Sequence, residues 1–100
     1  MSVLITGRFP GDTATFRRAL VERADEFAGV AERARAAGCI HHRFGVGEDF
    51  VMVVDEWGTA EQFQEFFADP QLQEFIASTG AAPGPPDLTI TEAVASPDQF

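Results

Sequence analysis

The chain of 100 residues carries a formal net charge of −9 at pH 7, and its pI lies near 4.4. This length fits a single domain, and the negative charge argues against nucleic acid and anionic membrane surfaces as partners, because both would repel it. No apolar stretch approaches the ~20 residues that cross a bilayer, and the apolar cluster over residues 3–5 is too short for a signal peptide. We therefore expect a cytoplasmic protein, which also fits the single cysteine, Cys39.

The first third of the chain predicts a strand followed by a long helix. Residues 2–9 show the two-residue period of a half-buried strand, which Pro10-Gly11 ends as a turn. Apolar positions then recur with helical spacing over residues 12–37, and Gly38 can end the helix. Gly29 lowers the stability of that helix by up to ~1 kcal/mol relative to Ala, so it is the candidate position for a bend or break.

The middle of the chain predicts an antiparallel hairpin. Residues 39–46 form the first strand, and a short polar connection separates them from the apolar run 50–57, which reads as a central strand buried on both faces. Adjacent residues of a strand point to opposite faces, so His41 and His42 are expected on different sides of the sheet, with Cys39 on the side of His41. The polar end of the central strand is a candidate pocket wall.

Two helical segments and a final strand complete the predicted elements. Thr59–Gln62 match a capping box, which starts a helix with an inward stripe of phenylalanines. Asp69-Pro70 fit the cap and first turn of a restarted helix, so the second helical region is expected in one piece or two. A proline-rich loop over residues 81–86 leads to a last strand at 88–94, and residues 96–100 are expected to form a loose tail.

The order of these elements predicts the architecture. Strand, helix, strand, strand, helix and strand give one α+β domain over residues 1–95 with ferredoxin-like topology. The right-handed crossover rule then leaves a four-stranded antiparallel sheet with both helices on one face. The apolar run 50–57 makes the other face of the sheet apolar as well. We therefore expect a homodimer, in which two such faces pack across a two-fold axis.

A set of short motifs resembles one known family. The motifs are Gly7-Arg8-Phe9, Ala37-Gly38-Cys39, Phe50–Trp57, Thr59-Ala60-Glu61, Phe66-Phe67, Asp69-Pro70, Leu72 and Phe75. They resemble the antibiotic biosynthesis monooxygenase family of dimeric α/β-barrel proteins, over residues 3–94. The resemblance implies a homodimer whose two sheets form a barrel, with a pocket in each subunit between sheet and helices. It also implies, for part of the family, oxygenation of phenols or quinols without a cofactor, and a pocket lined by the tryptophan that matches Trp57.

The sequence departs from that family at several polar positions. Phe66 stands where members often carry a histidine nine residues after the tryptophan, and Gln71 replaces a second histidine. Gly7 falls near an asparagine that haem-degrading relatives use, and the chain contains no tyrosine. These departures make haem degradation the least favoured activity. They also support an alternative, a non-catalytic ligand-binding or structural homodimer of the same fold.

The leading hypothesis is a cofactor-independent, monooxygenase-like protein that binds a small apolar aromatic of phenol or quinol type and holds no metal. One of His41 and His42 is the candidate catalytic proton acceptor, because imidazole titrates near neutral pH. Because adjacent strand residues diverge, the two histidines cannot ligate one metal ion together. The candidate substrate-binding residues are Trp57, Phe63, Phe66 and Phe67, for which the plainer alternative is an ordinary place in the core.

The acids and the cysteine have simpler interpretations. Asp55 and Glu56 point to opposite faces and so do not form a two-carboxylate pair for acid–base chemistry. We expect one of them to pair with Arg8 or Arg43 across neighbouring strands. Cys39 is expected to be a small buried residue, because nothing in the sequence identifies a base that would activate it.

Overall fold

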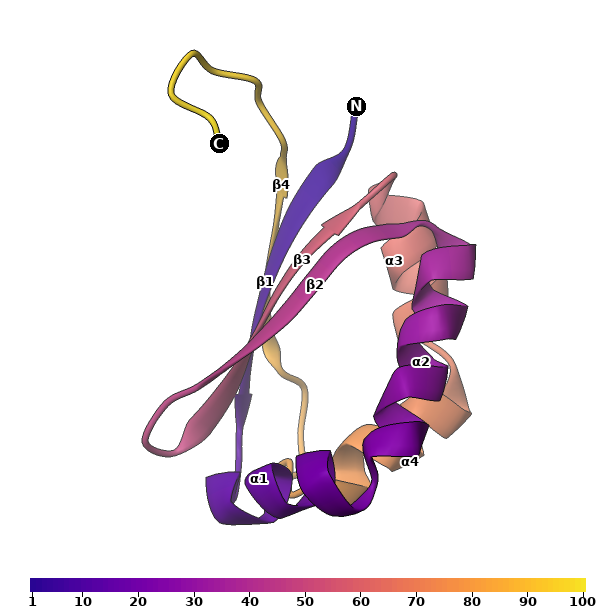
Figure 1. The fold of residues 1–100 in the computed structure, drawn as a ribbon, viewed down its shortest axis with the longest axis vertical. Helices are drawn as coiled ribbons and strands as arrows, with labels where there is room; N and C mark the ends of the chain where they lie inside the picture. Colours follow the sequence, from indigo (N-terminus) through magenta and orange to yellow (C-terminus); the bar gives the residue numbers. More distant parts are fainter.

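A four-stranded antiparallel sheet with four helices over one face makes up the protein, in a computed structural model that covers residues 1–100 (Figure 1). The strands β1 (Val3–Pro10), β2 (Cys39–Val46), β3 (Phe50–Trp57) and β4 (Asp87–Glu92) lie in the order β2-β3-β1-β4. The helices are α1 (Thr13–Glu22), α2 (Ala24–Ala37), α3 (Ala60–Phe67) and α4 (Pro70–Ser78). This arrangement confirms the predicted ferredoxin-like fold, with each helical region divided in two. None of the helices is long and apolar enough to cross a membrane.

The first helical region breaks at Arg23, so the prediction of Gly29 as the candidate break was wrong. Arg23 leaves the helical conformation, with φ −120° and ψ 33°, while Gly29 stays inside α2. The Arg23 side chain donates to Ser78 Oγ at 2.8 Å, and its guanidinium lies 4.8 Å from the centre of the Phe75 ring. These contacts join the α1–α2 junction to α4. The contacts with α4 therefore set the position of the break, and the intrinsic helix propensity of Gly29 does not.

The second helical region also divides, at the Asp69-Pro70 pair. Asp69 caps α4 by accepting from the backbone N–H of Gln71 at 3.0 Å, and the proline occupies the first turn. The capping box predicted for α3 is present, because Thr59 and Gln62 each accept from the backbone N–H of the other. The last strand, β4, is shorter than predicted and ends at Glu92.

The register of the strands decides which side chains face the helices. In the β2–β3 ladder His42 lies opposite Asp55 and Cys39 lies opposite Trp57, with a bulge between Cys39 and His41. The extra residue in the bulge turns Cys39 to the same face as His42, whereas strict alternation predicted the opposite face. The hairpin therefore directs His42, Asp55, Trp57 and Cys39 together toward the helices.

The fully buried part of the protein is small. Nine of the 100 residues are buried, and the apolar cluster among them is Ile5, Ala34, Trp57 and Phe63. This cluster lies at one end of the space between sheet and helices, where α2 and α3 pack on β1 and β3. Phe16 and Ala19 of α1 are buried as well, whereas the other inward-facing apolar residues keep some exposed surface because the space between the two layers is not filled.

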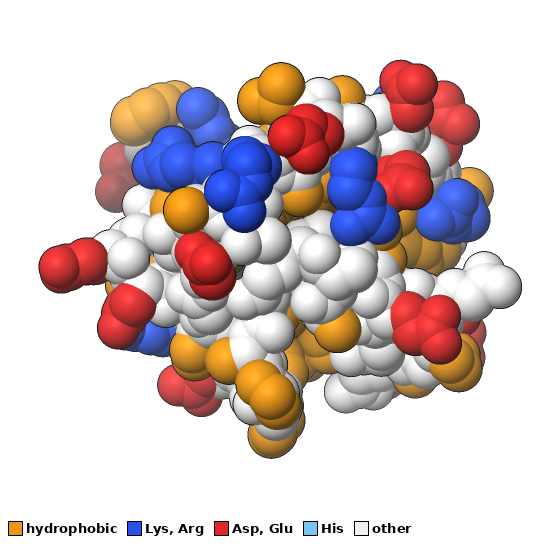
Figure 2. Space-filling view, turned by 90° about the horizontal axis from the view of Figure 1, so that it is seen from below, with side chains coloured by type: hydrophobic (Ala, Val, Ile, Leu, Met, Phe, Trp, Pro, Cys, Tyr) orange, Lys and Arg blue, Asp and Glu red, His pale blue; other side chains and the backbone are white.

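The face of the sheet away from the helices is apolar at its centre. Leu4, Met52 and Val54 are between 37% and 47% exposed on this face. At the end of the molecule where α1 lies, arginines and acids are interspersed with hydrophobic side chains (Figure 2). The negative charges behind the net charge of −9 are thus not concentrated in one acidic patch on that surface.

Candidate functional site

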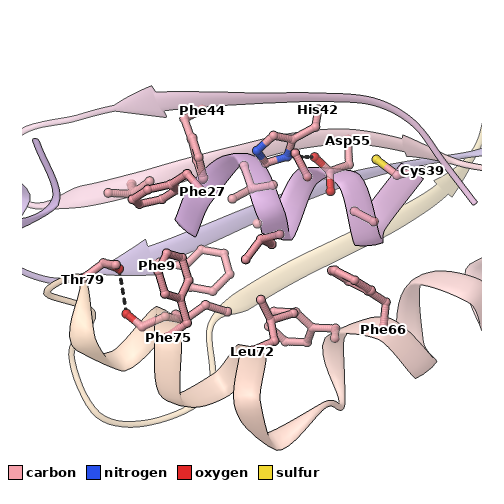
Figure 3. A pocket seen from close by; sticks show the side chains of 18 of the residues that line it. Phe9, Phe27, Cys39, His42, Phe44, Asp55, Phe66, Leu72, Phe75 and Thr79 are labelled. Carbon is pink, nitrogen blue, oxygen red and sulfur yellow. Dashed lines mark hydrogen bonds and ion pairs between the residues drawn. The ribbon is translucent and has the colours of Figure 1, made fainter. Parts of the chain in front are cut away.

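A cavity of about 520 Å³ lies between the sheet and the helices. It is apolar, since 23 of its 32 lining residues are hydrophobic. Phenylalanines from several elements make up much of the wall, as the close view shows (Figure 3). They include Phe9, Phe16, Phe27, Phe44, Phe66 and Phe75. A cavity of this size and character is typical of a site for a small organic molecule.

Edge-to-face contacts hold these rings in place. Phe16, Phe27 and Phe44 contact one another with ring centres 5.0 to 6.1 Å apart and planes close to perpendicular. Phe27 also contacts Phe75, at 4.9 Å, which connects α2 to α4. Aromatic pairs in this geometry are favourable beyond the area they bury. The rings therefore form a fixed lining that can enclose a flat aromatic molecule.

The mouth of the cavity lies between α2 and the free edge of β2. Apart from Asp12, the exposed lining residues come from these two elements. Ala28 and Arg35 belong to α2, and the half-exposed Ile40 and His42 belong to β2. Arg35 is the one arginine of the lining. A ligand would therefore enter over the edge of the sheet and pass His42.

A hydrogen-bonded group of three polar side chains lies in the cavity wall. Asp55 is 6% exposed, and its Oδ1 lies 2.7 Å from Nδ1 of His42. Its other oxygen, Oδ2, accepts from the indole Nε1 of Trp57 at 3.0 Å. Both carboxylate oxygens thus have a partner, which satisfies the requirement that buried polar groups be hydrogen-bonded. The group is an acid held from one side by an indole and from the other by an imidazole.

His42 is placed to act as a proton acceptor. With Asp55 accepting at Nδ1, the neutral imidazole carries its proton on Nδ1, and Nε2 keeps a free lone pair. Nε2 lies on the side of the ring away from Asp55, toward Phe27 and Phe44 (Figure 3). The Phe44 ring contacts the imidazole edge-to-face at 4.6 Å. The orientation of the imidazole is therefore fixed by a hydrogen bond and by packing.

The two candidate histidines differ in their surroundings. Both border the cavity, but only His42 contacts an acid of the cavity wall. His41 lies opposite Glu56 in the ladder, on the side that faces away from Asp55. The structure therefore brings His42, and not His41, together with Asp55 and Trp57.

The candidate aromatic residues form one end of the cavity. Trp57 is 1% exposed and packs against Phe63 and Phe66, with ring centres 5.7 and 5.4 Å away. Phe67 stacks on Phe63 at 5.4 Å. The indole N–H is already used by Asp55 and so is not available to a ligand. Contact between these four residues and a ligand stays a prediction.

The expected ion pair with Arg8 or Arg43 is not formed, and this prediction was wrong. Asp55 pairs with His42, while Glu56 on the other face accepts from the Ser2 hydroxyl at 2.5 Å. Arg8 lies over the Phe50 ring, with its guanidinium carbon 3.8 Å from the ring centre. Asp55 faces the interior, where an arginine on the outer face cannot reach it, and the Glu56 carboxylate is bonded to Ser2 instead.

Cys39 lies beside the polar group and is kept protonated. Burial, and secondarily the negative charge of Asp55, raise the pKa of the Cys39 thiol to about 11. The thiol donates to the backbone carbonyl of His41 at 3.3 Å. It is therefore a neutral, poorly nucleophilic part of the wall near pH 7. No three His, Cys, Asp or Glu side chains meet in a way that could hold a metal ion.

The comparison with known structures identifies the fold. The monooxygenase ActVA-Orf6 of Streptomyces coelicolor, solved in complex with nanaomycin D, is 26% identical, with a TM-score of 0.68 over 95% of this chain and 89% of that one. SnoaB of Streptomyces nogalater, a cofactor-independent oxygenase, is 14% identical, with a TM-score of 0.60 over 98% of both chains. A putative antibiotic biosynthesis monooxygenase of Caulobacter crescentus is 15% identical, with a TM-score of 0.65 over 94% and 91%.

These neighbours confirm the resemblance that the sequence motifs indicated. The chain has the fold of the antibiotic biosynthesis monooxygenases, the dimeric α/β-barrel fold, over nearly its whole length. No protein-family model matches the sequence, and no curated protein matches it. The fold is shared by oxygenases and by proteins without a known function, so the chemistry must be argued from the site itself.

Proposed function

We propose that this protein binds a small apolar aromatic of phenol or quinol type in its cavity and oxidises it with O₂, using neither metal nor flavin. The observation that carries the proposal is the position of His42, whose imidazole is oriented by Asp55 at the wall of an apolar, phenylalanine-lined cavity. The fold supports it, because SnoaB is a cofactor-independent oxygenase and ActVA-Orf6 is a monooxygenase solved with the ligand nanaomycin D.

The polar groups of the cavity favour a phenol over a carbon acid. Removing a proton from carbon next to a carbonyl leaves an oxyanion that needs a hydrogen-bond donor. The one indole N–H of the wall is taken by Asp55, and the Cys39 thiol is turned to a backbone carbonyl. In a phenol, whose pKa is about 10 as in tyrosine, the oxygen that gives its proton to His42 also carries the negative charge, so the imidazolium itself is the donor. The site therefore suits an O–H acid with an apolar ring system.

Beyond a base and an apolar cavity, the proposed reaction needs few groups from the protein. His42 takes the phenol proton, and the resulting anion gives electrons to O₂. One oxygen atom is bonded to a ring carbon, which loses its hydrogen, and becomes the second carbonyl of a quinone. The other oxygen atom leaves as water, which takes up the ring hydrogen and the proton held by His42, so that the imidazole returns to its neutral form. The wall, including Trp57, Phe63, Phe66 and Phe67, contributes orientation and the exclusion of bulk water, while proton transfer by a positioned base contributes about 10²–10⁴-fold.

Oxygen uptake tests this function directly. The protein is incubated with a panel of anthrols and quinols in an oxygen electrode, and quinone products are identified by mass. We expect uptake with at least one ring system, a loss of about 10²-fold or more in His42→Gln, and near-normal uptake in His41→Gln. A flat trace with every ring system would remove the oxygenase and leave a binding protein, which quenching of Trp57 fluorescence by ligands that are recovered unchanged would identify.

We further propose that the protein is a homodimer through the outer face of its sheet. Leu4, Met52 and Val54 form an exposed apolar centre on that face, and packing against a second copy would cover them. Sedimentation should show a species of about twice 10.8 kDa at micromolar concentration. Val54→Glu, which places a charge at the centre of the contact, should shift it to the monomer. A wild-type protein that sediments as a stable monomer would contradict the proposal.

A further inference from the structure

We propose that the cavity takes up a phenol in its neutral form, ionises it and keeps the proton on His42, so that the bound state is an imidazolium held between the Asp55 carboxylate and a phenolate. This inference rests on the proposed binding of phenols in the cavity, but not on the oxidation step. It assigns Asp55 as a positioning residue, which acts on the ligand through His42 and does not touch it.

The first argument is the fixed position of Asp55. Its two oxygens are 2.7 Å from His42 Nδ1 and 3.0 Å from Trp57 Nε1, and the residue is more than nine-tenths buried. Trp57 is itself 1% exposed and packs against Phe63 and Phe66, so packing holds the donor to Oδ2 in place. A carboxylate held in this way fixes the tautomer of the imidazole, with the proton on Nδ1 and the lone pair on Nε2.

The second argument is the charge around the site. The Cys39 thiol is neutral near pH 7, because its pKa is raised to about 11. Arg35 lies at the mouth, Asp12 caps α1, and His41 and Glu56 lie opposite each other in the strand ladder on the side away from Asp55. Asp55 is therefore the nearest charge to His42. A phenolate from solution would bring a second negative charge beside it, whereas a neutral phenol would not.

The proton transfer is balanced within the site. The phenol O–H bond breaks, a new N–H bond forms at His42 Nε2, and the electron pair of the O–H bond stays on the phenol oxygen. The second imidazole proton stays on Nδ1, hydrogen-bonded to Asp55 Oδ1. The imidazolium then donates to both anions. The net charge of the protein–ligand complex equals that of the separate neutral phenol and protein.

An O₂-stable phenol with a coloured anion tests the inference without any turnover. We choose 2-hydroxyanthraquinone, whose phenolate absorbs at longer wavelength than its neutral form, and mix it with the protein about one pH unit below its own pKa. We expect the bound dye to show the phenolate spectrum. We also expect calorimetric titrations in two buffers of different ionisation enthalpy to give the same binding enthalpy, because no proton leaves the complex. Bound dye that stays neutral, or release of one proton per dye, would overturn the inference.

Variants separate His42 from Asp55. His42→Gln should bind the dye in its neutral form, with at least a tenfold lower phenolate fraction, whereas the matched His41→Gln should keep the phenolate spectrum. Asp55→Asn can donate from its amide to Nδ1 and so should move the imidazole proton to Nε2. Nitrogen-15 NMR of the ligand-free protein reads this tautomer directly: Nδ1–H in the wild type and Nε2–H in the variant. A wild-type protein with the proton on Nε2 contradicts the role of Asp55 even if the variant does not fold.

The outcomes distinguish this inference from the proposed function. Ionisation of the dye together with a flat O₂ trace for oxidisable phenols would remove the oxygenase and leave the proton transfer standing. Binding of the dye in neutral form would remove the proton transfer and leave the binding site standing. Failure of the dye and of smaller naphthols to bind would overturn both.

Discussion

Replacing Trp57 by phenylalanine should lower stability mainly through a lost hydrogen bond. The indole N–H is donated to Asp55 Oδ2 at 3.0 Å, and both residues are almost fully buried. Hydrogen bonds to charged groups contribute about 1.5–3 kcal/mol, and a buried oxygen left without a donor also costs its desolvation. The smaller ring removes contacts with Phe63 and Phe66, which adds about 1 kcal/mol. We therefore expect Trp57→Phe to lower the free energy of unfolding by about 3 kcal/mol.

Urea unfolding at a fixed protomer concentration, followed by circular dichroism, measures this change. For a chain of this length the loss corresponds to a fall in Tm of roughly 12–24 °C. A double-mutant cycle separates the hydrogen bond from packing: in an Asp55→Ala background the indole has no acceptor to lose, and Trp57→Phe should cost only about 1 kcal/mol. Val21→Ala, at an 80% exposed position, serves as a control and should change stability by less than about 0.5 kcal/mol. Equal losses in both backgrounds would refute the coupling.

Three further predictions concern features outside the hydrogen-bonded group. Gly38→Ala should lower the free energy of unfolding by about 1–2 kcal/mol in urea, because Gly38 has φ 125° and the added Cβ would collide with Gln62. Gly29→Ala, inside α2, should raise it by up to about 1 kcal/mol. Alkylation of Cys39 by iodoacetamide should stay slow up to about pH 9 and accelerate as the pH approaches the raised thiol pKa of about 11; rapid alkylation at pH 8 would contradict the burial of the thiol beside an acid. Arg23→Ala should cost about 1 kcal/mol by releasing α4 from the α1–α2 junction, and a wild-type stability in that variant would mean that the break in the helix does not depend on this contact.

The strands could be predicted closely because their signals are local. The apolar run that forms β3 and the turns on either side of the hairpin are visible in the sequence, and so are the capping box at Thr59 and the Asp69-Pro70 restart. The break at Arg23 was missed because no local signal marks it. It depends on the position of Ser78 and Phe75, which lie more than 50 residues away along the chain.

The sequence was compatible with the pairing of His42 with Asp55. A hairpin centred on residues 48–49 pairs Val46 with Val51 and, four residues further along each strand, His42 with Asp55. The connection between the strands allowed more than one register, so the sequence alone did not choose this one. The bulge at Cys39 could not be predicted, since it inserts a residue without a glycine or proline to mark it.

The cavity itself leaves no sign in the sequence. The phenylalanines of its wall have the same spacing as residues that pack directly on one another, and helical periodicity shows only which way a side chain points. Whether opposed rings meet or leave a space depends on the distance between the sheet and the helices. That distance is set by the whole set of contacts at the two ends of the layers, where Trp57 and Phe63 close one of them.

Because so few residues are buried, a molecule in the cavity would contribute to the stability of the native state. With about 520 Å³ left open and nine residues buried, the empty protein lacks much of the apolar contact that a domain of 100 residues ordinarily has. A ligand at 100 times its Kd adds about 2.7 kcal/mol to the stability of the native state, which is a large share of what a small domain possesses. On the proposed function, the resistance of this protein to proteolysis should therefore be higher with the cavity filled than with it empty.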